Sequence, residues 1–103
     1  MNQAARDALR AAALAGVKQL RDGQVRDGRG GLCAMGVLEE AGLKLELARM
    51  HDTRVDGCHL CGAAKQPCGW RITSEISLLC HVNNDHGLDF IGVAEKMPVT
   101  DAP

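Results

Sequence analysis

The feature that most constrains this 103-residue chain is a pair of cysteines separated by two residues and followed by glycine, Cys58-His59-Leu60-Cys61-Gly62. Two thiolates at this spacing can curl around one small cation, and the glycine permits a positive φ that turns backbone N–H groups toward the sulfurs. Residues 52–70 are broken by glycine and proline and show almost no hydrophobic periodicity, so they need a cross-link to hold them in place. The sequence therefore predicts a bound Zn²⁺ with a structural role.

Cysteines further along the chain offer the remaining ligands. Cys68 supplies a third thiolate, and Cys80 and His81 are favoured for the fourth position because both lie in an expected helix. The sequence does not choose between them, and we take Cys80 as the first candidate. The second C-x2-C or H-x3-5-H pair that usually completes such a site is taken to be missing from this sequence. The predicted metal set is thus Cys58, Cys61, Cys68 and Cys80, with His81, His59, His86 or His51 as alternatives for the fourth ligand.

Other readings of the cysteine pair fit less well. A redox C-x2-C pair usually follows a buried strand, and residues 53–57 are too short and too polar for one. Ordinary reduced thiols in a loop remain an alternative. A catalytic zinc needs an open coordination position and a nearby carboxylate base, whereas this chain offers candidates for all four positions. We therefore expect no enzymatic activity and nominate no catalytic residue.

Hydrophobic periodicity predicts a mostly α-helical fold of four to five helices in one domain, residues 1–103. Apolar residues recur at three- and four-residue steps over residues 3–21, 32–41, 43–50, 74–83 and 90–97. The expected organisation is helical over 1–51 and 72–97, with an inserted zinc loop over 52–71 and a frayed tail over 98–103.

Capping residues support these helices. Asn2, Asp89 and one of Thr73 and Ser74 precede apolar periodic segments and are good N-caps. Gly42 follows such a segment and is a natural helix stop, and Gly87 or Asn84 supplies the positive φ of a turn.

Charge is unevenly distributed along the chain. Residues 1–30 hold six Lys/Arg against three Asp, whereas residues 31–103 hold six Lys/Arg against ten Asp/Glu. A basic region of this kind makes a nucleic-acid-binding zinc module an alternative function. A helix-turn-helix over residues 74–97 is disfavoured, because its second helix is acidic. The candidate nucleic-acid-binding residues are Arg6, Arg10, Lys18, Arg21, Arg26 and Arg29.

The expected setting is a reducing cytoplasm. The cysteine count of five is odd, and Arg6, Asp7 and Arg10 interrupt the Ala-rich start, which therefore lacks the apolar segment of a secretory signal. We find no window with the roughly 18 apolar residues of a membrane span.

Two segments resemble a group of small, uncharacterised proteins of bacteriophages and actinobacteria. Residues 32–38 resemble their F-C-C-L-G-V-L segment, and residues 84–94 resemble their N-D-x-G-x-S-F-x-E-I-A segment. The chain departs from these patterns at Ala34-Met35 and at Gly92, and the cysteine-rich middle has no counterpart there. The resemblance implies a shared fold and a phage-type origin, and it implies no activity.

The function expected from the sequence is that of a small zinc-stabilised binding protein of phage or prophage type. It would act by protein–protein interaction with a host protein, inhibition being one expected outcome. A lesser alternative is a zinc-dependent or His-Asn-His-like nuclease, because the segment after the cysteine pair contains His81, Asn83, Asn84, Asp85 and His86. Those nucleases need strands before the catalytic histidine, and this region is expected to be helical.

Overall fold

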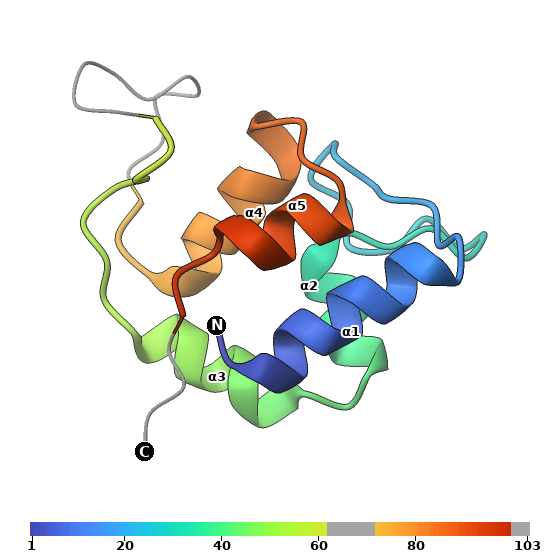
Figure 1. Ribbon diagram of the computed structural model, residues 1–103, viewed down its shortest axis with the longest axis horizontal. Helices are drawn as coiled ribbons and strands as arrows, with labels where there is room; N and C mark the ends of the chain where they lie inside the picture. Colours follow the sequence, from blue (N-terminus) through green and yellow to red (C-terminus); the bar gives the residue numbers. More distant parts are fainter. Residues whose placement is uncertain (62–71, 100–103) are drawn as a thin grey trace.

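The computed structural model describes residues 1–61 and 72–99, which form five α-helices (Figure 1). The helices are α1 (Gln3–Leu14), α2 (Ala34–Glu40), α3 (Lys44–Asp52), α4 (Glu75–Asp85) and α5 (Phe90–Lys96). Over these residues the β-structure is limited to isolated bridges. This arrangement confirms the mostly α-helical fold predicted from the sequence.

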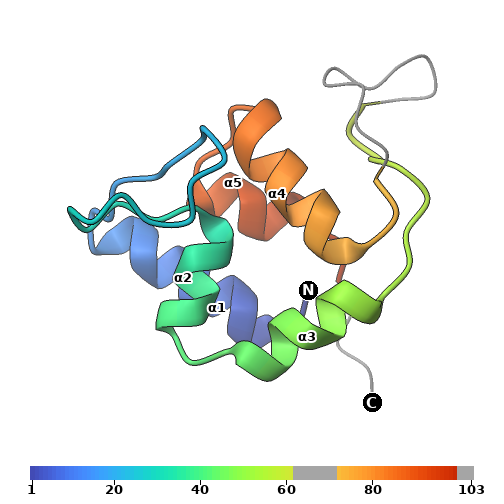
Figure 2. The same ribbon diagram turned by 180° about the vertical axis from the view of Figure 1, so that it is seen from behind.

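The helices surround one apolar core. α1 packs against α5 and α2, while α4 contacts α2, α3 and α5 (Figures 1 and 2). The core side chains are mainly aliphatic, and the chain's one phenylalanine, Phe90, is buried among them. The largest fully buried apolar side chains are Met1, Leu9, Leu38, Met50, Leu78, Leu79, Met97, Val82 and Val93.

Local capping sets the predicted helix starts. The Asn2 side chain accepts a hydrogen bond from the Ala5 amide at 2.9 Å, and that of Asp89 accepts one from the Gly92 amide at 2.7 Å. Ser74 and Ser77 form a reciprocal capping box at the start of α4. Each of these side chains satisfies an amide that the first helical turn leaves without a partner.

The first helix is shorter than predicted, ending at Leu14 where the periodicity had suggested residue 21. Gly16 adopts a φ of 72°, the Val17 amide donates to Ala12 O at 3.1 Å, and the Gly16 amide donates to Ala13 O at 3.1 Å. This Schellman motif stops the helix. Val17 and Leu20 continue the helical spacing of apolar residues, but both lie in the loop that follows α1. There Val17 packs against the apolar core and Leu20 is buried.

A long loop, residues 15–33, joins α1 to α2 and is fastened to α4 by one buried side chain. The Asn83 amide nitrogen donates to Leu20 O at 2.7 Å, and its oxygen accepts from the Ala34 amide at 3.1 Å. The same oxygen accepts from Gln19 Nε2 at 2.9 Å. Asn83 thus ties the loop and the start of α2 to the helix that carries the candidate site.

A group of charges, of which all but the half-buried Arg49 are buried, lies where the chain's first residues meet α3 and α4. Arg49 of α3 reaches both Glu46 and Glu75, with Arg49 Nη2 at 3.2 Å from Glu75 Oε1. The amino group of Met1 forms an ion pair with the same glutamate, which is 1% exposed. Opposite charges therefore compensate each other at this point in the interior.

Across the described residues, none of the helices is both long enough and apolar enough to cross a lipid bilayer.

Candidate metal centre

The segment that follows α3 is held beside the start of α4 by backbone hydrogen bonds. The amides of Val55 and Gly57 donate to Thr73 O at 3.1 Å and to Ile72 O at 2.9 Å. In the other direction, the Glu75 amide donates to Thr53 O at 2.9 Å. Gly57 then turns the chain with a φ of 78°. This short two-chain pairing delivers the following residues, among them the cysteine pair, to the side of α4.

Two histidines come from α4 and the turn that ends it. His81 lies within the helix and is buried, with 4% of its surface exposed, while His86 is the C-cap residue. Gly87, with a φ of 67°, reverses the chain directly afterwards, and it is one of the two residues predicted for this turn. The two imidazole rings meet edge to face, with centroids 4.7 Å apart.

These elements bring together Cys58, Cys61, His81 and His86. One ligand atom from each lies within 4.8 Å of the others. His86 Nε2 is 3.4 Å from both sulfurs and 3.1 Å from His81 Nε2. His81 Nε2 is 3.2 Å from Cys61 Sγ. These four side chains can hold a metal ion.

Four of the six separations among the ligand atoms are close to those of a tetrahedral zinc site, and the other two are within 4.8 Å. Zinc–sulfur bonds of about 2.3 Å and zinc–nitrogen bonds of about 2.0 Å place sulfur and nitrogen about 3.5 Å apart in a tetrahedron. Two nitrogens in the same geometry lie about 3.3 Å apart. The observed separations of 3.1 to 3.4 Å are therefore only slightly shorter than those of a coordinated ion.

Burial and hydrogen bonding prepare the group for metal binding. Cys58 is 7% exposed, whereas Cys61 and His86 are half-buried. Burial lowers the pKa of His86, and the charge of the neighbouring His81 lowers it further to a smaller extent. Both effects favour the neutral imidazole that a metal requires. His81 Nδ1 lies 2.9 Å from Asp85 Oδ2, so the opposite ring nitrogen faces the sulfurs.

The structure brings together only part of the predicted ligand set. Cys58 and Cys61 are present in the group, and two of the alternatives for the fourth position, His81 and His86, complete it. Cys80 precedes His81 on α4 but is not part of the group, because adjacent positions on a helix project in different directions. Burial raises the pKa of its thiol, so the reactive thiolate is disfavoured there.

The remaining candidates lie elsewhere in the chain. His51 is exposed in the last turn of α3, and His59, also exposed, places Nε2 2.7 Å from Lys96 O. Cys68 lies outside the residues that the structure describes, so its role as a ligand stays a prediction.

Sequence reasoning missed the pairing of His81 with His86. Four residues separate these histidines, which gives the H-x3-5-H spacing of many zinc sites. Together with the cysteine pair they form a C-x2-C…H-x4-H pattern, and this was the available signal. The prediction that no such second pair exists is therefore wrong.

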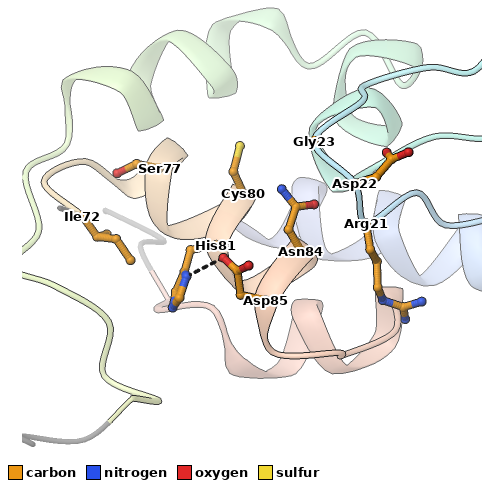
Figure 3. A pocket seen from close by; sticks show the side chains of 9 residues that line it. All are labelled: Arg21, Asp22, Gly23, Ile72, Ser77, Cys80, His81, Asn84 and Asp85. Carbon is orange, nitrogen blue, oxygen red and sulfur yellow. Dashed lines mark hydrogen bonds and ion pairs between the residues drawn. The ribbon is translucent and has the colours of Figure 1, made fainter. Parts of the chain in front are cut away.

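A cavity of about 550 Å³ lies beside the candidate metal centre (Figure 3). His81 and Asp85 form part of its wall, so the cavity borders one of the candidate metal-binding imidazoles. It is lined by Arg21, Asp22, Gly23, Ile72, Ser77, Cys80, His81, Asn84 and Asp85.

Of the cations predicted as a nucleic-acid surface, Arg6 is buried, and several of the exposed ones contact acceptors within the protein. Arg6 is buried, and its Nη1 donates to Met1 O at 3.1 Å. Arg26 pairs with Glu39 at 2.7 Å and with Glu40 at 2.9 Å. Arg21 Nη2 donates to Leu88 O at 3.0 Å, and Lys18 lies 3.9 Å from Asp27. Arg10 lies 3.7 Å from Asp7, and Arg29 is exposed.

The comparisons with known proteins find no matching family model, no similar curated protein and no similar solved structure.

Proposed function

We propose that this protein is a small zinc-stabilised binding protein, in which the ion has a structural role. The observation that carries the proposal is the convergence of two sulfurs and two imidazole nitrogens at separations close to those of tetrahedral coordination.

The donor set favours zinc among the common metal ions. Ca²⁺ and Mg²⁺ prefer oxygen ligands, and the four converging atoms are sulfur and nitrogen. A tetrahedral arrangement of two thiolates and two imidazoles is typical of structural zinc sites.

A structural role follows from what the ion would connect. The cysteines belong to the segment after α3, and the histidines belong to α4 and its C-cap. An ion bound to all four would add a cross-link to the few backbone hydrogen bonds that join these segments. Four protein ligands also complete a tetrahedron, so this site would present no open position for a substrate or a water nucleophile. We therefore propose a non-enzymatic role.

The binding role rests on the sequence more than on the site. The resemblance of residues 32–38 and 84–94 to small phage and actinobacterial proteins motivates a host protein as the partner, reached in the reducing cytoplasm. In this proposal the zinc-folded domain presents its surface to that partner and inhibits it. A His-Asn-His-like nuclease is less well supported, because His81 lies in a helix that follows no strand within the described residues.

The nucleic-acid alternative is less well supported than protein binding. Phosphate binding needs accessible cations, whereas Arg6 is buried and Arg26 is paired with two carboxylates. A gel-shift titration at low salt checks this alternative, which would be restored by DNA or RNA binding that weakens steeply as salt rises.

Native mass spectrometry with and without a chelator tests the metal site. We expect one zinc ion per chain, and we expect it to be lost in Cys58→Ser and His81→Ala and retained in Cys80→Ser. A chain that carries no zinc, or that keeps it in Cys58→Ser, contradicts the proposal. Cys68→Ser, measured in parallel, decides whether Cys68 also binds the ion.

Partner binding needs a separate experiment. The zinc-loaded protein and its Cys58→Ser variant are immobilised and exposed to bacterial lysate. We expect a stoichiometric host protein on the zinc-loaded chain that is absent from the variant. Equal capture by both proteins, or no capture, contradicts a zinc-dependent binding function.

A further inference from the structure

Asp85 lies directly behind one of the candidate metal ligands. It is the last residue of α4, four positions after His81, and these two positions lie on the same side of a helix. Asp85 Oδ2 is 2.9 Å from His81 Nδ1, and Figure 3 shows the two side chains turned toward each other. The His81 side chain is 2% exposed and that of Asp85 is 32% exposed, so the carboxylate connects a buried ring to the surface.

The protonation of an imidazole decides whether it can bind a metal. A neutral ring carries one proton, and the metal binds the nitrogen that lacks it. His81 Nε2 is the nitrogen that faces Cys61 Sγ and His86 Nε2, at 3.2 Å and 3.1 Å. The ring can bind an ion there only if its proton is on Nδ1, and a carboxylate accepts a hydrogen bond from that position.

We propose that Asp85 is a positioning residue that holds His81 in the metal-binding tautomer and orientation. This inference rests on the proposed zinc site. Carboxylate partners of this kind typically contribute 10- to 100-fold to metal affinity.

The contact distinguishes the two histidines. His86 is half-buried in the turn after α4, and over the described residues no carboxylate contacts its Nδ1 at hydrogen-bond distance. His81 is instead fixed by its helix, by burial and by Asp85. The hydrogen bond of Asp85 therefore orients His81, while its charge also acts on the neighbouring His86, whose pKa it raises against the larger effect of burial.

Substitution of Asp85 separates positioning from simple packing. Asp85→Asn is nearly isosteric, so a packing role predicts a small effect, smaller than that of Asp85→Ala. The asparagine amide can also donate to Nδ1 and so favour the tautomer that carries its proton on Nε2, which cannot bind a metal. A positioning role therefore predicts that Asp85→Asn binds zinc at least as weakly as Asp85→Ala.

Zinc affinity is measured by competition with a chromophoric chelator on the full chain. We expect both variants to bind about 10- to 100-fold more weakly than the unsubstituted protein. Asp85→Glu, which keeps the carboxylate, should recover part of the affinity. Asp56→Asn is the matched control, because Asp56 is exposed in the neighbouring segment 53–57, and it should bind zinc like the unsubstituted protein.

Nuclear magnetic resonance of the zinc-loaded proteins gives a second readout, which reports on the Nδ1 position of His81 itself. The Nδ1 proton of His81 should exchange slowly with water in the unsubstituted protein and rapidly in Asp85→Ala. An affinity of Asp85→Asn within about twofold of the unsubstituted value overturns the positioning role, even if zinc still binds. Absence of zinc binding in the unsubstituted protein overturns the proposed function, and this inference with it.

Discussion

At the scale of single residues, buried polar side chains specify how the segments of this protein meet. Asn83 is 1% exposed, and both ends of its amide are used, by Leu20 O on one side and by the Ala34 amide on the other. Leaving a buried polar group without a partner costs more free energy than a hydrogen bond contributes. Asn83 therefore favours the one position of the residue 15–33 loop against α4 in which its amide is fully hydrogen-bonded.

Replacement of Asn83 by alanine should destabilise the fold by about 2 to 4 kcal/mol, because it leaves two buried backbone groups without partners. The free energy of unfolding, measured with denaturant at saturating zinc, checks this value. Gln24→Ala, an exposed change in the same long loop, should stay within about 0.5 kcal/mol of the unsubstituted protein. A loss below about 1 kcal/mol in Asn83→Ala would show that water replaces the amide without cost.

Glu46 predicts an acid dependence of stability. The hydrogen bond from Arg49 lowers the pKa of this buried carboxyl from its ordinary value near 4.5. The folded state therefore binds the proton less tightly than the unfolded state, so the contribution of Glu46 to stability is complete above the ordinary pKa. It is lost as the pH falls below 4.5 toward the lower folded value.

Glu46→Gln should accordingly be less stable than the unsubstituted protein at pH 6, and the difference should shrink as the pH falls below about 4.5. Denaturant unfolding of both proteins at each pH measures the difference between their free energies of unfolding. Any loss of metal at low pH affects both proteins alike and so largely cancels in this difference. Glu95→Gln, an exposed change on α5, is the control. A difference that stays constant across this range would contradict the linkage.

At the scale of elements, glycine at the end of a helix decides where the chain turns. Gly16 ends α1 with a φ of 72°, and Gly42 follows α2 with a φ of 77°. The prediction of Gly42 as a stop is confirmed, whereas Gly16 was not recognised because apolar residues continued at helical spacing beyond it. Both helices end at a glycine with positive φ, but only the end of α2 coincides with the end of a run of apolar residues at helical spacing.

Gly16→Ala tests this chemistry. No atom lies within 4 Å of a Cβ added at Gly16, so the expected cost of about 1 to 2 kcal/mol is that of a left-handed backbone alone. Gly16→Asn should cost less, because asparagine tolerates this conformation better than alanine does. Thermal unfolding measures both changes, and equal stability of Gly16→Ala and the glycine-containing protein would show that α1 can end differently.

At the scale of the whole molecule, the candidate metal centre joins distant parts of the chain. The contacts among its ligand atoms span 28 residues between Cys58 and His86 and 20 residues between Cys61 and His81. An ion bound there would oppose separation of the segment 53–61 from α4. Its binding free energy would therefore contribute directly to folding.

Stability should consequently depend on free zinc. Above the dissociation constant, each tenfold rise in free zinc should raise the free energy of unfolding by about 1.4 kcal/mol, if the unfolded chain binds zinc weakly. Unfolding in zinc buffers, followed by circular dichroism, gives this slope. Cys80→Ser should show the slope, and His81→Ala should lose it. A stability independent of zinc in the unsubstituted protein would contradict a structural ion.

The sequence by itself determined the helices, most of their caps and the cysteine pair, because each depends on neighbours a few residues away. The Ser74, Asp89 and Gly42 signals are of this kind, and all three were predicted, Ser74 as one of two alternatives. Only the tertiary structure decided that His81 and His86 join the cysteines while Cys80 does not. The H-x4-H spacing of the two histidines was compatible with such a site, but the choice between them and Cys80 depends on which side of α4 receives the segment after α3. Helical periodicity does not encode that docking.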